Sequence, residues 1–264
     1  MESIRVPLLV AAALWAGAAA ADEARPFCVN RPGKVTPPCI LDTGKLQIEV
    51  GLVDAALTRQ PGNAVDNWAF GATVVRLGLG PTTEVQVGWT PFALSHMHSG
   101  GGTMRGVGDV SLALRQSLLR PDGSGVSVAV QPFVTAPTAT GGQGAGDWTG
   151  GVLLPFAAAL PAGFGFAATP EIDLYPNASG HGSHAAFTGV VAVSHPIGAV
   201  TLGAELWGRR NDDPDQPVTQ VSADFSAAWV PKATPNLQFD IGANAGLNRN
   251  TAEIELYVGV ATRF

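Results

Sequence analysis

The sequence of 264 residues has little charge of either sign. Only 14% of its residues are Asp, Glu, Lys or Arg, against about a quarter in ordinary soluble domains, and lysine is especially scarce. The charged exterior of a soluble enzyme is therefore missing, and lipid is one surrounding that could replace it. The net charge of -6 and the lack of a basic patch argue against nucleic acid as a partner.

Long apolar stretches are missing too, except at the N-terminus. Arg5 precedes an uncharged stretch over residues 6–21, which ends in small residues directly before Asp22. This pattern is typical of a secretory signal peptide, and the stretch is short for a spanning helix, which needs about 20 apolar residues. We predict a signal peptide over residues 1–21 and an exported mature chain, with an uncleaved anchor as the alternative.

Cysteine is nearly absent. Cys28 and Cys39 both lie in the Pro-rich residues 22–44, before the first predicted strand. Export would place them in an oxidising compartment, where a disulfide is the expected state. Their spacing excludes a C-x-x-C redox or metal site, and neither is at the cleavage point of a lipoprotein. Residues 22–44 are therefore predicted to be a periplasmic lead-in restricted by a disulfide.

What the chain does have is alternation of apolar and polar residues with a period of two, repeated along residues 45–264. Val200, Leu202 and Leu206, for example, alternate with Thr201 and Glu205. The runs are about 10 residues long, as tilted membrane-crossing strands are, and short Gly/Pro turns alternate with longer polar loops. The pattern predicts an all-β fold, namely a transmembrane antiparallel up-and-down β-barrel of about 12 strands with short periplasmic turns and longer extracellular loops.

The width of such a barrel decides which face points inward. A soluble barrel also alternates, but side chains cannot fill the centre of one with about twelve strands. The apolar faces are therefore predicted to meet lipid and the polar faces to surround water. Tryptophans near predicted strand ends suggest the aromatic girdles of a membrane barrel, with ordinary core aromatics as the alternative: Trp68, Trp89, Trp148, Trp207 and Trp229. Trp207 falls on a polar face.

The polar faces supply the candidate site residues. Charged and amide side chains are predicted to line the lumen, namely Glu84, Gln86, Arg115, Gln131, Glu171, Asp173, Glu205, Arg209, Asp224, Asp240, Asn244 and Glu255. Because carboxylates outnumber cations, we expect a preference for cations or neutral solutes. The open alternative is that these groups pair across the lumen and plug it.

The last residue, Phe264, ends an alternating strand of an exported chain. A terminal aromatic residue of this kind resembles the signal by which barrel assembly machinery recognises its substrates. The predicted partners are therefore that machinery, outer-membrane lipid and a small-molecule solute.

Neither a metal site nor an enzyme is predicted. His96, His98, His181 and His184 have spacings that could ligate a metal, but they lie in predicted outer loops, where solvated histidines are the favoured interpretation. Ser95 beside His96 invites comparison with outer-membrane lipases. The sequence has no G-x-S-x-G elbow and no third group placed by its pattern, so the lipase stays an alternative and no cofactor is expected.

Three segments resemble a known barrel family. They are residues 37–51 with the motif L-Q-I-E-V-G, residues 106–110 with G-V-G-D-V, and residues 236–242 with N-L-Q-F-D-I-G. They are similar to the family described as "putative MetA-pathway of phenol degradation", over essentially the whole mature chain. The resemblance implies an outer-membrane barrel and passage of aromatic or other hydrophobic compounds, and it carries no catalytic residues.

The sequence thus predicts an outer-membrane pore or passive transporter for small molecules. A structural or adhesive barrel with a plugged lumen is the first alternative, and an outer-membrane lipase is the second.

Overall fold

The computed structural model describes residues 24–60, 63–98 and 100–264. The predicted signal peptide lies outside these residues. Within them, no helix is long and apolar enough to cross a membrane. The helical part of the described chain is a single 3-10 turn, η1 (Pro161–Gly163).

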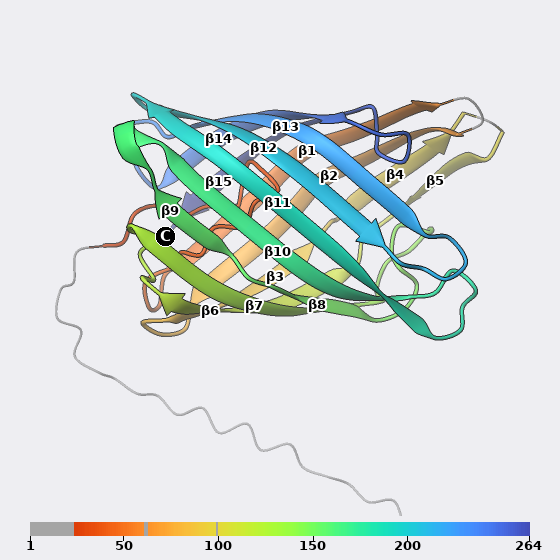
Figure 1. Ribbon diagram of the computed structural model, residues 1–264, viewed down its shortest axis with the longest axis horizontal. Helices are drawn as coiled ribbons and strands as arrows, with labels where there is room; N and C mark the ends of the chain where they lie inside the picture. The colour runs from red at the N-terminus through yellow and green to blue at the C-terminus, as the bar shows by residue number, and fades with distance from the viewer. Residues whose placement is uncertain (1–23, 61–62, 99) are drawn as a thin grey trace, which may run out of the picture.

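The described strands form one closed antiparallel sheet, wound as a tilted barrel (Figure 1). They are β1 (Leu46–Gln60), β2 (Asn63–Gly78), β3 (Thr83–Trp89), β4 (Phe92–Met97), β5 (Gly102–Gly106), β6 (Val110–Leu119), β7 (Val126–Ala136), β8 (Thr149–Leu153), β9 (Phe156–Ala159), β10 (Gly165–Pro176), β11 (Ser183–Ile197), β12 (Val200–Asn211), β13 (Val218–Trp229), β14 (Leu237–Gly246) and β15 (Ile254–Arg263). The sheet closes because β1 pairs with both β2 and β15.

Three of the crossing strands are interrupted, which reconciles fifteen segments with twelve crossings. β3 and β4 form one crossing, because both pair with β2. β5 and β6 form the next crossing, because β5 pairs with β4 and β6 pairs with β3. β8 and β9 both lie between β7 and β10. Pro91 and Pro155 lie at two of the breaks, where a residue without an N–H cannot donate to the ladder. The prediction of a twelve-strand up-and-down barrel is confirmed.

The distribution of side chains is the reverse of that in a soluble protein. Phe225 and Ile241, in the middle of their strands, are 62% and 61% exposed on the outer face. Arg76, Glu84 and Arg115 are 0% exposed inside. Closure pairs the backbone of every strand, which hydrocarbon surroundings require. The predicted orientation, apolar outward and polar inward, is therefore confirmed.

Two of the predicted outer loops are strand instead. β1 and β2 stay paired up to Gln60 and Asn63. On the long-loop side of the break at Pro91, β4 pairs with β5. The prediction that four histidines lie in loops is corrected for two of them, because His96 belongs to β4 and His184 to β11. His98 and His181 lie outside the strands, as predicted. In the extension of β1 and β2, Thr58, Arg59, Asp66 and Asn67 place polar side chains on both faces, so the period-two signal that marks lipid-facing strands is absent there.

The polar extensions are held by contacts between neighbouring strands. Arg59 pairs with Asp66 across β1 and β2, and the ring of His98 lies 3.0 Å from the same carboxylate. His96 contacts the hydroxyl of Thr103 at 2.8 Å. Cross-strand polar pairs of this kind stabilise a hairpin that projects into water.

Two of the five tryptophans lie at the ends of barrel crossings, as predicted. Trp229 ends β13, and Trp148 directly precedes β8. Trp89 ends β3, but at the break where β4 continues the same crossing. Trp68 lies within β2, because that strand continues further than predicted. Trp207 lies within β12 on the inner face, where a cation covers its ring, and takes no part in a girdle.

Candidate functional site

The segment before β1 runs inside the barrel. Residues 24–44, drawn in red and orange, enter at the end that also holds the C-terminus and the short turns (Figure 1). The disulfide between Cys28 and Cys39 is present, as predicted, and closes a loop within this segment. Ile40 and Leu41, which follow it, are 1% and 0% exposed. The sequence predicted a lead-in but gave no sign that it enters the barrel.

One side of the lead-in contacts an electrically balanced part of the wall. The buried guanidinium of Arg76 lies 2.9 Å from Glu49 and 2.9 Å from Glu84. It also donates to the carbonyl oxygen of Cys28 at 2.8 Å. One buried arginine thus joins two strand carboxylates to the backbone of the lead-in.

Arg115 repeats this arrangement two strands further on, on β6. Its Nη1 lies 3.4 Å from Glu84 and 3.1 Å from the carbonyl oxygen of Cys39, to which it donates. Its Nη2 donates to the side-chain oxygen of Asn30 at 2.8 Å. The N–H of Leu41 donates to the Glu84 carboxylate at 2.9 Å. Both ends of the disulfide-closed loop are therefore fixed to this wall.

The opposite side of the lead-in contacts an acidic part of the wall. Arg31 forms an ion pair with Asp240 at 3.0 Å. The ammonium of Lys34 lies 3.2 Å from Asp224 and 3.4 Å from Glu255. Because the loop holds cations on this side, it bridges the lumen from the balanced wall to the acidic wall.

Close approach of the lead-in to β12 depends on Gly33. A Cβ atom at this position would overlap the carboxylate of Glu205, which accepts the backbone N–H of Lys34 at 2.7 Å. The Lys34 ammonium also lies 4.7 Å from the centre of the Trp207 ring. Counting Glu205, four carboxylates of the acidic wall face two cations of the lead-in, so this region keeps an excess of negative charge.

A third polar group lies further along β10, towards the long-loop rim. Glu171 and Asp173 are two positions apart on β10, so both side chains lie on the inner face. The Arg209 guanidinium lies over the ring of Tyr175, 4.7 Å from its centre. Thr169, closer to the short-turn rim, exchanges hydrogen bonds of 3.1 Å with the backbone of the lead-in.

The twelve candidate site residues all lie on strands and point to the inner face. Eight are buried, namely Glu84, Gln86, Arg115, Gln131, Asp173, Asp224, Asp240 and Asn244. Four are half-buried, namely Glu171, Glu205, Arg209 and Glu255. The structure brings them together as three separate groups and not as one ring.

Sequence reasoning missed several partners of these residues. Glu49 and Arg76 alternate with apolar neighbours exactly as the predicted residues do, so the same signal could have found them. The lead-in residues Asn30, Arg31 and Lys34 follow no periodicity. Only the positive charge of Arg31 and Lys34, opposite to that of the predicted lumen, indicated their place, and nothing in the sequence indicated that of Asn30.

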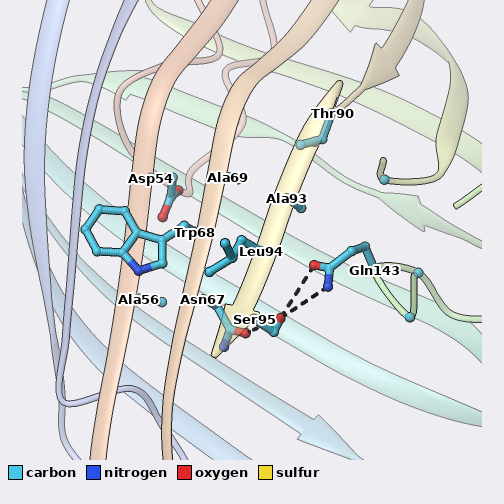
Figure 2. A pocket seen from close by; sticks show the side chains of 13 residues that line it. Asp54, Ala56, Asn67, Trp68, Ala69, Thr90, Ala93, Leu94, Ser95 and Gln143 are labelled. Carbon is cyan, nitrogen blue, oxygen red and sulfur yellow. Dashed lines mark hydrogen bonds between the residues drawn. The ribbon is translucent and has the colours of Figure 1, made fainter. Parts of the chain in front are cut away.

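The lead-in leaves empty space inside the barrel. A cavity of about 510 Å³ lies between it and β9 to β13, and its lining includes Ala167, Ala192 and Glu205. A cavity of about 490 Å³ lies towards the long-loop rim, where Figure 2 shows Ser95 and Gln143 pointing toward each other. The interior is therefore only partly filled by the lead-in.

The described residues offer no group of three or more His, Cys, Asp or Glu side chains able to hold a metal. Ser95 and His96 are neighbours on β4 and point to opposite faces. The Ser95 hydroxyl donates to Asn67 at 2.7 Å, and His96 contacts Thr103. These two residues do not form the serine–histidine pair that a hydrolase needs.

A closed barrel with an apolar exterior and a polar, partly open interior is the architecture of outer-membrane channel proteins. The chain belongs to the family described as "Putative MetA-pathway of phenol degradation", whose model matches residues 29–264. The resemblance drawn from the three sequence motifs is therefore confirmed.

Solved structures share the fold at low sequence identity. An outer membrane channel from Pseudomonas putida F1 aligns with a TM-score of 0.67 at 12% identity, over 89% of this chain and 99% of that one. The NanC porin aligns with a TM-score of 0.50 at 11% identity, over 82% of this chain and 98% of that one. Comparison with curated proteins finds no match.

Proposed function

We propose that this protein is a passive channel of the Gram-negative outer membrane for small solutes, partly filled by its own N-terminal lead-in. The observation that carries the proposal is the charged inner wall, which surrounds both the lead-in and unfilled space. Groups that only stabilised a barrel would leave no such space beside them. Membership of a barrel family and likeness to channels and porins support the same function.

The acidic wall sets the expected ion preference. Four carboxylates around Arg31 and Lys34 leave excess negative charge next to the cavity beside the lead-in. Side chains of one sign that line a narrow passage repel ions of that sign. Cations and neutral solutes should therefore pass more readily than anions.

Neutral aromatic compounds are the solute class that the family description suggests. The cavity beside the lead-in supports this class, because alanines and glycines line much of it, among them Ala157, Ala167 and Gly203. Small apolar side chains leave room for a flat ring without holding it tightly. A channel needs such weak binding, since a solute must leave as easily as it enters.

The test is reconstitution of the mature chain in planar bilayers and in liposomes. We expect single-channel currents with a reversal potential that shows cation selectivity in a KCl gradient, and uptake of phenol into liposomes. Current without selectivity would contradict the role of the acidic wall. The absence of both current and uptake would overturn the proposed function.

The alternative of a plugged structural barrel has one observation in its favour. The backbone of the lead-in bonds to buried arginines at both Cys28 and Cys39. A barrel of this kind would give no flux in the same experiment and would keep a loop-dependent partner. The lipase alternative requires serine-directed labelling together with lipid hydrolysis, and neither is expected.

A further inference from the structure

The G-x-G-D motif of residues 106–109 has a structural role besides forming part of the barrel wall. Asp109 directly precedes β6, and its carboxylate accepts two backbone N–H groups of the connection between β7 and β8. Oδ1 accepts from Ala139 at 2.8 Å, and Oδ2 accepts from Ala145 at 3.0 Å. One carboxylate thus holds both ends of a turn, residues 139–145, which we call the mouth loop.

The first glycine of the motif makes room for this loop. A Cβ atom on Gly106 would overlap the carbonyl oxygen of Thr140. The N–H of Thr140 donates to the Val107 carbonyl at 3.1 Å, and the Thr140 hydroxyl accepts the Val107 N–H at 3.2 Å. The mouth loop therefore extends the sheet beside β5, where β7 has already ended.

The loop also reaches into the barrel. Gln143 is half-buried between exposed neighbours, and its side-chain amide lies 3.5 Å from the Ser95 hydroxyl on β4. Residues 142–144 cover one side of the cavity of about 490 Å³ (Figure 2). Apart from this contact, the amide of Gln143 is free to meet a molecule in the cavity.

The remaining walls of the cavity combine small apolar and acidic groups. Ala56, Ala69 and Ala93 form an apolar floor on three neighbouring strands, and the Asp54 carboxylate lies beside it. This combination suits a small solute with a hydrogen-bond donor on a short apolar body. Asp54 also interacts with Glu255 and with the lead-in cations, so the pocket adjoins the acidic wall. An ammonium group is favoured, because the charged side chain that lines the pocket itself is a carboxylate.

We propose that the mouth loop, held by Asp109, closes a solute-binding pocket at the extracellular mouth, and that the pocket takes small ammonium solutes. This inference rests on the proposed channel function, since the pocket lies on the route into the lumen. Asp109 is a positioning residue that acts through Gln143 and the loop backbone, while Asp54 contacts the solute.

The position of the loop can be tested without any transport measurement. A cysteine introduced by Gln143→Cys would be a single free thiol in the described chain, because Cys28 and Cys39 are disulfide-bonded. Adding Asp109→Asn to this cysteine variant places an amide donor against a backbone N–H, so the mouth loop should open more often. We therefore expect labelling of the thiol to become about tenfold faster or more. The matched control is Asp147→Asn in the same connection, whose carboxylate contacts only the N–H of Trp148.

The pocket itself is tested by block of single-channel current. Butylammonium added on the loop side should reduce the current of the parent channel, and butyrate of the same length should not. Asp54→Asn should raise the blocking concentration about tenfold, the effect of one lost charged contact. Asp109→Asn should raise it as well, because the loop that closes the pocket is no longer held. Gln143→Ala, which leaves the Asp109 contacts in place, should raise it less.

The outcomes separate the two proposals. Unchanged labelling in Asp109→Asn would overturn the proposal that Asp109 holds the mouth loop, even in a conducting channel. Equal block by butylammonium and butyrate would overturn the pocket. A parent chain without current would contradict the channel function and leave the labelling result standing. Native heat-modifiable migration on gels would check that each variant has folded.

Discussion

At the scale of single residues, the largest effects on stability are expected from charged side chains that are buried inside the barrel. Arg76 and Arg115 are completely buried, and removing such a charge from water costs several kcal/mol unless it is paired. Here each guanidinium meets a carboxylate and a lead-in carbonyl. The balanced cluster is therefore a structural anchor, while the half-buried contacts of Lys34 are easier to break.

At this scale, Glu84→Gln should destabilise the protein strongly. The change leaves Arg76 and Arg115 without their shared carboxylate, and breaking a buried pair costs about 3–5 kcal/mol. Denaturant unfolding of the refolded barrel in detergent would measure it. Glu171→Gln, which removes an inner carboxylate that the lead-in does not contact, is the matched control. Equal losses in the two variants would contradict the anchoring role.

A pH effect is expected at the turn between β6 and β7. The backbone N–H of Ser124 donates to the Asp122 carboxylate, and the Ser124 hydroxyl does so as well, which lowers the pKa of Asp122 below its ordinary value of 3.8. A lowered pKa stabilises the folded state above the ordinary value. This contribution is lost as the pH falls through the lowered pKa.

The wild type should therefore lose more thermal stability than Asp122→Asn between about pH 5 and pH 2. The difference should be small, because the turn faces solvent. Melting curves in detergent across this range would measure it. Parallel pH profiles for the two proteins would contradict the hydrogen-bonded carboxylate.

At the scale of elements, the sequence predicted well wherever one face of a strand meets lipid. Residues 200–209 alternate clearly, and β12 runs from Val200 to Asn211. The pattern failed where both faces are wet, as at Arg59 and Asp66, because nothing there selects apolar residues. It also failed for the lead-in, whose place depends on ion pairs between residues about 200 positions apart, such as Arg31 and Asp240. Local patterns carry no information on such pairs.

Freeing the lead-in from the barrel wall should change the current through the barrel. Replacing both Cys28 and Cys39 by serine frees the ends of the loop that bridges the lumen. We expect larger and noisier single-channel currents, and a loss of about 3 kcal/mol in the free energy of unfolding.

Reductant provides the control for this variant. It should reproduce the effect in the wild type and leave the double serine variant unchanged. Identical currents with and without the disulfide would show that the bridge has no influence on the passage.

At the scale of the whole molecule, closure of the barrel depends on the C-terminal strand. β15 pairs with β1, and the N–H of Phe264 donates to the Leu46 carbonyl at 2.8 Å. The Phe264 ring is 62% exposed, so packing does not account for it. Recognition by barrel assembly machinery is the role we propose.

Deletion of Phe264 should therefore lower the amount of folded protein in the outer membrane of cells. The stability of the same variant refolded in detergent should change little, because the ring packs against little. Phe264→Tyr, which keeps an aromatic terminus, is the control. Normal assembly of the deletion variant would contradict the proposed signal.

The central claim is that charge holds the lead-in against an acidic wall and so limits passage through the barrel. The most direct measurement compares the single-channel conductance of the wild type with that of Arg31→Ala/Lys34→Ala. Lys232→Ala/Arg210→Ala, which removes two exposed cations from the rims, is the control. The account predicts a larger, still cation-selective conductance for the lead-in variant and no change for the control. Equal conductance in all three proteins would contradict it.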